Sequence, residues 1–135
     1  MSEDDADALA MPLILLVEDE VLIREMLVEA LEEAGFSTLA AADARRAVEL
    51  FEENGDEIRG LVTDIDLAAG TDGWALARQV REHIADLPVV YISGASFHHW
   101  ASHGVPNSLM VAKPFAAAQV VVAISSLLVA SDSAP

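Results

Sequence analysis

Two hydrophobic patterns alternate along the chain. Short continuous apolar runs, of which Leu13–Val17 is the first, are typical of strands buried on both faces. Longer segments between them carry apolar residues every three or four positions, as in Val21–Leu31, and this spacing predicts helices with one buried face. The pattern therefore predicts strands and helices in alternation from Leu13 to Val129.

The boundaries of these elements follow from apolar runs and from capping residues. The expected strands cover 13–17, 36–40, 61–63, 89–92 and 109–111. The expected helices cover 21–34, 44–54, about 74–84, 95–103 and 116–129. Gly35 supplies a stop for the first helix, and Asp43 can cap the second. Five strands alternating with five helices predict an α/β fold, a doubly wound parallel sheet with helices on both faces.

One folded domain accounts for most of the chain. The length of 135 residues and the mass of 14.3 kDa match a common domain size. We expect residues 1–11 to form a disordered acidic tail, residues 12–130 the domain, and residues 131–135 a frayed C-terminal tail.

Charge and composition exclude several classes of function. The 23 acidic and 7 basic residues give a net charge of −16, which argues against binding to nucleic acid or anionic membranes. The absence of cysteine excludes disulfides, thiol nucleophiles and cysteine-based zinc sites. No apolar run approaches the ~18 residues of a membrane span, and the acidic N-terminus differs from a secretory signal. We expect a soluble, cytoplasmic protein.

Reactive side chains follow four of the five expected strands. Glu18 and Asp19 follow the first strand, Asp64 the third, Ser93 the fourth and Lys113 the fifth. In a parallel sheet these positions share the carboxyl edge, where binding sites gather. Lys113 is the only lysine in the chain, which makes a purely solubilising role a poor explanation for it.

This set of residues is suited to phosphoryl transfer. Three neighbouring carboxylates repel one another, and a hard cation such as Mg²⁺ would neutralise them. A metal-bound aspartate can attack phosphorus and form an aspartyl phosphate. Lys113 and the hydroxyl group of Ser93 could then bind the oxygens of the phosphoryl group.

The ordered set Glu18-Asp19, Asp64, Ser93 and Lys113-Pro114-Phe115 resembles the receiver domain of two-component response regulators. The resemblance runs from Leu13 to Val129 and is to the stand-alone, chemotaxis-regulator-like type. It implies a flavodoxin-like (βα)₅ fold with strand order 2-1-3-4-5.

The resemblance also implies a role for each residue of the set. Asp64 would be the phosphoacceptor. Asp19 and Asp64 would bind Mg²⁺ directly together with the backbone carbonyl of Asp66, and Glu18 would act through a metal-bound water.

The same resemblance assigns the phosphoryl-binding groups. The hydroxyl group of Ser93 would reorient toward the phosphoryl group, and Lys113 would contact it. The Lys113–Pro114 peptide bond is expected to be cis.

Three positions depart from the family pattern. Met110 stands where a switch aromatic is usual, and a flexible methionine could repack in its place. Ala68 replaces a usual proline, and the loop 67–71 is one residue longer than is typical. Asp66 adds a fourth carboxylate, which we expect beside the site, where it would alter metal affinity or the lifetime of the phosphoryl group.

The resemblance implies protein partners rather than an output domain in this chain. A histidine kinase or histidine phosphotransfer protein would dock on the first helix near Arg24, Glu25 and Glu29. A downstream protein would bind the face formed by the fourth helix, the fifth strand and the fifth helix. Its candidate contacts are Phe97, His98, His99, Trp100 and His103, although Trp100 could equally pack against its own domain with the histidines solvated. The chain would catalyse only its own phosphorylation and dephosphorylation.

Two other functions remain as alternatives. Asp64-Ile65-Asp66 resembles the nucleophile motif of haloacid dehalogenase-type phosphatases. In those enzymes the nucleophile motif comes before an acidic pair, whereas here the pair Glu18-Asp19 comes first. A length of 135 residues also leaves no room for the cap domain that would shield a substrate from water. A pseudo-receiver that signals without phosphorylation is disfavoured by the complete set of site residues and favoured only by Met110.

Overall fold

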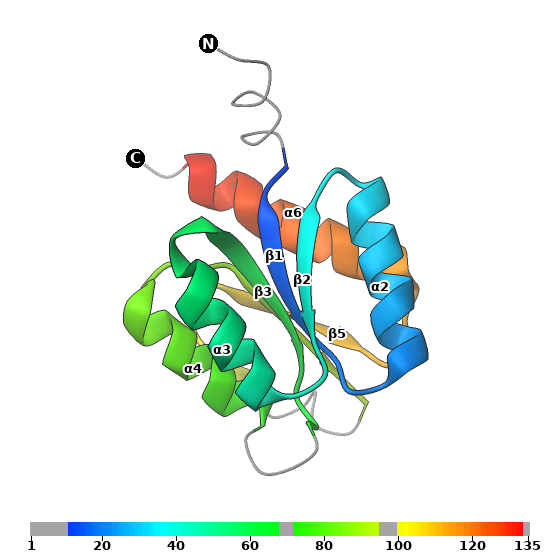
Figure 1. Ribbon diagram of the computed structural model, residues 1–135, viewed down its shortest axis with the longest axis horizontal. Coiled ribbons are helices and arrows are strands. Elements are labelled where there is room, and N and C mark those ends of the chain that lie inside the picture. Colours follow the sequence, from blue (N-terminus) through cyan, green and yellow to red (C-terminus); the bar gives the residue numbers. More distant parts are fainter. Residues whose placement is uncertain (1–10, 68–71, 95–99, 134–135) are drawn as a thin grey trace.

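The protein is an α/β structure with one central parallel sheet (Figure 1). The computed structural model describes residues 11–67, 72–94 and 100–133. The strands are β1 (Leu13–Val17), β2 (Ser37–Ala41), β3 (Ile58–Asp64), β4 (Val89–Ser93) and β5 (Ser108–Ala112). Their order in the sheet is β2-β1-β3-β4-β5, and every pairing is parallel. The predicted doubly wound fold and strand order are confirmed.

Helices cover both faces of this sheet (Figure 1). They are α2 (Val21–Glu33), α3 (Ala44–Asn54), α4 (Gly73–His83), α5 (Trp100–His103) and α6 (Ala117–Ser133), with a 3₁₀ turn η1 (Gly55–Glu57) after α3. Helices α3 and α4 pack on one face, and α2 and α6 pack on the other. Among the described residues, no helix is both long and apolar enough to cross a membrane.

Each central strand contributes to two separate cores, because successive side chains point to opposite faces. In β1, Leu15 and Val17 belong to the core beneath α3 and α4, while Ile14 and Leu16 belong to the core beneath α2 and α6. This double burial explains why β1 is a continuous apolar run rather than an alternating one.

Capping residues set the helix boundaries, and those at Asp43 and Gly35 agree with the sequence prediction. Asp43 Oδ1 accepts a hydrogen bond of 2.8 Å from the backbone N–H of Arg46, and Asp72 Oδ1 accepts one of 2.8 Å from that of Ala75. Gly35 has φ +99°, a left-handed conformation that favours glycine. This conformation does not continue a helix, so α2 ends just before it.

Two boundaries differ most from the sequence prediction. Strand β3 begins at Ile58 rather than at residue 61, because Ile58 is buried although the exposed Arg59 interrupts the apolar run. Helix α6 continues to Ser133, so the prediction of a frayed tail from residue 131 was wrong over its first three residues. No proline or glycine interrupts the sequence between Ala116 and Ser133, and nothing there ends a helix. The predicted acidic tail, apart from Met11, lies outside the described residues.

Candidate functional site

The carboxyl ends of β1 and β3 bring three acidic side chains together. Oxygen atoms of Glu18, Asp19 and Asp64 all lie within 4.8 Å of one another. Glu18 is 0% exposed and Asp64 is 2% exposed, so both carboxylates are largely withdrawn from water. The cluster that the sequence predicts is confirmed for these three residues.

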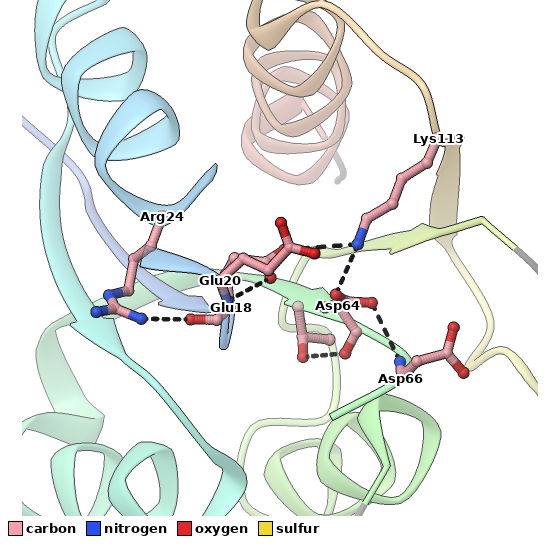
Figure 2. A network of polar contacts seen from close by, with 7 residues as sticks. Glu18, Glu20, Arg24, Asp64, Asp66 and Lys113 are labelled. Carbon is pink, nitrogen blue, oxygen red and sulfur yellow. Dashed lines mark hydrogen bonds and ion pairs between the residues drawn. The ribbon is translucent and has the colours of Figure 1, made fainter. Parts of the chain in front are cut away.

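Lys113 reaches into this cluster from the loop after β5 (Figure 2). Its Nζ atom lies 2.9 Å from Asp64 Oδ2 and 3.9 Å from Glu18 Oε1. Partial burial disfavours the ammonium form, but the hydrogen bond and the charge of Asp64 outweigh it and raise the pKa of Lys113. Lysine therefore stays charged beside the aspartate. The Lys113–Pro114 peptide bond is cis, as predicted.

The backbone fixes the second oxygen of Asp64. Asp64 Oδ1 accepts a hydrogen bond of 3.1 Å from the N–H of Asp66. Figure 2 shows the carboxylate of Asp66 pointing away from Asp64, and Asp66 is not part of the acidic cluster. Asp66 thus contributes its N–H to Asp64 while its carboxylate lies outside the cluster, and its expected effect on metal affinity or on the lifetime of the phosphoryl group stays a prediction.

Glu18 is held in place by the first turn of α2. Glu18 Oε2 accepts a hydrogen bond of 3.0 Å from the N–H of Glu20, and Arg24 Nη1 donates one of 2.8 Å to the backbone carbonyl of Glu18. Glu18 Oε1 is buried and has no hydrogen-bond partner among the described residues. A buried oxygen without a hydrogen bond costs free energy. A ligand that supplies a positive charge or a hydrogen-bond donor would reduce this cost.

These observations fit a magnesium ion. The cluster supplies hard carboxylate oxygens, the type of donor that Mg²⁺ prefers. Lys113 Nζ is at hydrogen-bond distance from Asp64, but it lies 3.9 Å from Glu18 Oε1 and leaves that buried oxygen without a hydrogen bond among the described residues. The donor set and the orphaned oxygen thus both match the metal that the sequence predicts.

Lowering the pH should stabilise the metal-free protein through Glu18. Burial raises the pKa of Glu18 from 4.5 to about 7, and the charge of Asp64 adds to the rise, while the Glu20 N–H and Lys113 oppose it. The contribution of the protonated form is therefore complete below pH 4.5 and is lost as the pH rises through 7. With metal chelated, we expect urea unfolding to give about 1 kcal/mol less stability at about pH 8 than at about pH 6.

Glu18→Gln provides the control for this pH dependence. The variant has no carboxyl group to titrate at this position, so the difference between the two pH values should shrink. An equal difference in both proteins would assign the pH dependence to other groups.

Ser93 and Gly73 complete the surroundings of Asp64. Ser93 is fully buried at the end of β4, and its backbone carbonyl accepts a hydrogen bond of 2.9 Å from the N–H of Lys113. Gly73 begins α4 so close to β3 that an added Cβ would lie 2.3 Å from the carbonyl oxygen of Asp64 and 2.8 Å from the Cα of Ile65. The sequence analysis did not assign this role to Gly73. One feature of the sequence could have indicated this role: a glycine, which is a poor helix former, stands at the first helical position after a capping aspartate.

Two residues of the predicted output face, Met110 and Trp100, lie in β5 at the edge of the sheet and in α5. Met110 is half-buried, sits opposite Tyr91 in the β4–β5 pairing, and packs against the core beneath α3 and α4. Trp100 is partly exposed, and its Nε1–H donates a hydrogen bond of 2.9 Å to Ser108 Oγ. Trp100 is thus anchored to its own domain, as the second interpretation predicts, while part of its ring remains accessible. Phe97, His98, His99 and the altered loop at 68–71 lie outside the described residues.

The predicted docking surface for a phosphodonor is the exposed side of α2 beside the cluster. Glu25 and Glu29 are exposed there, whereas Arg24 is engaged with the backbone of Glu18. Three apolar side chains of α2 are also exposed: Val21, Leu22 and Met26. The spacing of apolar residues in the sequence predicts that they lie on the buried face of this helix, and that prediction is wrong for these three. The exposed side of α2 therefore offers a mixed apolar and acidic surface.

Comparisons with known proteins agree with this arrangement. The family model for the response regulator receiver domain matches residues 14–125. The response regulator receiver protein CpdR of Brucella abortus is 32% identical over 120 residues, which cover 87% of this chain and 98% of CpdR. A crystal structure of a response regulator receiver protein from Sinorhizobium medicae superimposes with a TM-score of 0.85 at 41% identity, covering 90% of this chain and 98% of that one.

Some relatives are much longer proteins. The sensor kinase CckA of Brucella abortus is 30% identical over 121 residues, which are 88% of this chain but 13% of CckA. The chain likewise spans 34% and 51% of two transcriptional regulatory proteins.

Proposed function

This chain belongs to the response regulator receiver family, and we propose that it takes a phosphoryl group onto Asp64 with the help of Mg²⁺. The donor is a histidine kinase or a histidine phosphotransfer protein, and the signal passes on through protein contacts. The observation that carries the proposal is the position of Asp64, buried, paired with Lys113 at 2.9 Å and grouped with Glu18 and Asp19.

The chemistry is a displacement at phosphorus. A carboxylate oxygen of Asp64 forms the new P–O bond, and the bond between phosphorus and the donor's histidine nitrogen breaks, with its electron pair leaving on the nitrogen. Lys113 and the hydroxyl group of Ser93 bind phosphoryl oxygens, and their positions at the ends of β5 and β4 suit them to this. The backbone N–H of Asp66 orients the nucleophile through Asp64 Oδ1.

The metal would be held by Asp19, Asp64 and the backbone carbonyl of Asp66, with Glu18 acting through a metal-bound water. Bound Mg²⁺ supplies positive charge that offsets the carboxylates and the incoming phosphoryl oxygens. The orphaned, buried Oε1 atom of Glu18 supports its part in this arrangement.

The output would pass through the face formed by α5, β5 and α6. Ser93 would reorient on phosphorylation, and Met110, beside Tyr91, would repack where other receivers carry an aromatic side chain. A downstream protein would then bind near Trp100. In this proposal the chain acts in the cytoplasm and catalyses only its own phosphorylation and dephosphorylation.

Intact mass spectrometry tests the proposal. We expect the wild type to gain one phosphoryl group on incubation with acetyl phosphate and Mg²⁺, and to gain none with the metal chelated. Asp64→Asn should gain none, whereas Asp56→Asn, which changes an exposed aspartate on η1, should behave as the wild type.

Each rival function predicts another outcome in the same assay. Absence of any gain would support a pseudo-receiver. Sustained turnover of acetyl phosphate far beyond one equivalent would support a phosphatase of the haloacid dehalogenase type.

A further inference from the structure

Helix α2 carries a single basic residue, Arg24, together with four glutamates. Glu20 lies four positions before Arg24, a spacing at which an ion pair along a helix is favoured. Within residues 11–67, 72–94 and 100–133, however, no ion pair involves Arg24. Its Nη1 atom instead donates a hydrogen bond of 2.8 Å to the backbone carbonyl of Glu18. In a strongly acidic protein, this arginine is thus used on a neutral backbone oxygen.

The carbonyl that Arg24 binds lies directly before Asp19. A peptide unit is planar, so the direction of the Glu18 carbonyl also fixes the direction of the Asp19 N–H and the position of its Cα. Asp19 is half-buried, and its carboxylate belongs to the acidic cluster. Holding the carbonyl of Glu18 therefore restrains the backbone from which the Asp19 side chain extends.

Arg24 ties the start of α2 to the end of β1. The N–H of Glu18 donates a hydrogen bond of 3.0 Å to the carbonyl of Ala41, and the N–H of Glu20 donates one of 3.0 Å to Glu18 Oε2. Glu20 stands at the N-cap of α2 but makes no side-chain capping bond, which is the usual anchor for a helix start. The bond from Arg24 adds a donor on a side chain, so a substitution can remove it without changing the backbone or the cluster.

Arg24 and Lys113 approach Glu18 from opposite sides (Figure 2). Lys113 directs its ammonium group at the carboxylates, with Nζ 2.9 Å from Asp64 Oδ2. Arg24 donates to the backbone, so its hydrogen bond does not occupy a carboxylate oxygen of the cluster. The two cations therefore have different tasks: Lys113 contacts the carboxylates, and Arg24 holds the chain that presents them.

We propose that Arg24 is a positioning residue for the metal site. By holding the backbone carbonyl of Glu18, it keeps Glu18 and Asp19 in the arrangement that binds Mg²⁺. This role rests on the proposed function, because it requires that the acidic cluster holds Mg²⁺. It differs from the contact with a phosphodonor that the sequence analysis expects near Arg24, because it acts within the domain.

The direction of the change in Mg²⁺ affinity separates positioning from charge. A positive charge repels a metal cation, so the removal of a nearby cation tightens Mg²⁺ binding if charge alone matters. A positioning role predicts the opposite, because a loosened segment must be ordered when the metal binds, and this ordering costs free energy. Arg24→Met should therefore weaken Mg²⁺ binding although it makes the protein more negative.

Calorimetric titration of the full, unphosphorylated chain with Mg²⁺ measures this change. We expect the dissociation constant of Arg24→Met to be at least about tenfold higher than that of the wild type. Arg24→Lys keeps the charge and can donate one hydrogen bond to the same carbonyl, so its affinity should fall between the two. The control is Arg46→Met, which removes an exposed arginine paired with Glu49 on α3 and changes the net charge equally. It should bind Mg²⁺ at least as tightly as the wild type, because exposed ion pairs contribute little.

Amide hydrogen exchange in the metal-free protein, followed by NMR, gives a readout that does not need Mg²⁺. The N–H of Glu20 is held by Glu18 Oε2, in the segment that Arg24 restrains. In Arg24→Met we expect this amide to exchange at least about fivefold faster, and by a larger factor than the amide of Leu15 within β1. A variant that is only less stable would speed exchange of both amides by the same factor.

The possible results separate this role from its alternatives. If Arg24→Met binds Mg²⁺ as tightly as the wild type, or if the Glu20 amide exchanges at an unchanged rate, the inference is overturned while the proposed function stands. A wild type that binds no Mg²⁺ would overturn the proposed function and the inference together. If Arg24→Met slows phosphorylation by a histidine phosphotransfer protein at unchanged Mg²⁺ affinity, Arg24 is a donor contact and the positioning role is excluded.

Discussion

A single methyl group at position 73 is expected to lower the free energy of unfolding by about 2–3 kcal/mol and the phosphorylation rate by more than about tenfold. In Gly73→Ala the new Cβ would lie 2.3 Å from the carbonyl oxygen of Asp64 and 2.8 Å from the Cα of Ile65. Both neighbours are backbone atoms of the segment that carries the phosphoacceptor. Either α4 or the end of β3 must shift, and a shift of β3 moves Asp64 away from Lys113.

Urea unfolding and a time course of intact mass with acetyl phosphate measure the two effects. The control is Gly55→Ala, because a Cβ at that position would meet only the Phe51 ring, at 3.9 Å. Gly55→Ala should change neither stability nor rate appreciably. If Gly73→Ala were as stable and as active as the control, the close packing of α4 against Asp64 would not matter for the site.

Replacing Lys113 with methionine should reduce the phosphorylation rate by at least about 100-fold. Methionine keeps the approximate length of the side chain and removes the ammonium that lies 2.9 Å from Asp64 Oδ2. The phosphoryl oxygens then lose a positive partner as the new bond forms. Mg²⁺ should bind at least as tightly as in the wild type, because a cation no longer competes for the carboxylates.

The loss of Lys113 should also destabilise the metal-free protein, by about 2 kcal/mol, because Glu18 and Asp64 remain buried without a nearby cation. Calorimetric titration with Mg²⁺, the mass time course and urea unfolding separate the three effects. Lys113→Arg, which retains the charge, should preserve stability better than Lys113→Met. An unchanged rate in Lys113→Met would exclude Lys113 from the chemistry.

The topology and the acidic cluster could be predicted from the sequence because both depend on strong local signals. Continuous apolar runs such as Leu13–Val17 mark strands buried on two faces, and in a parallel sheet the residues just after them share one edge. The positions of the strand ends in the sequence were therefore enough to predict that Glu18, Asp64 and Lys113 lie close together. The cis bond at Pro114 followed from the family resemblance.

The remaining features depend on contacts that no local pattern encodes. The outward direction of the Asp66 side chain and the use of its N–H by Asp64 could not be seen in the sequence. The requirement for glycine at position 73 arises from the approach of α4 to β3, and the orphaned oxygen of Glu18 arises from burial. The exposure of Val21, Leu22 and Met26 also depends on tertiary packing. Helix α2 faces the core through Leu27 and Leu31, which leaves those three side chains in solvent.

The most direct test of the central claim is to locate the phosphoryl group in the chain. Borohydride reduces an aspartyl phosphate to homoserine, and peptide mass spectrometry then identifies the converted residue. After incubation with acetyl phosphate and Mg²⁺, we predict homoserine at position 64 and at no other position. Conversion at Asp19 or Asp66, or no conversion at Asp64 in protein that has gained a phosphoryl group, would contradict the assignment of Asp64 as the phosphoacceptor.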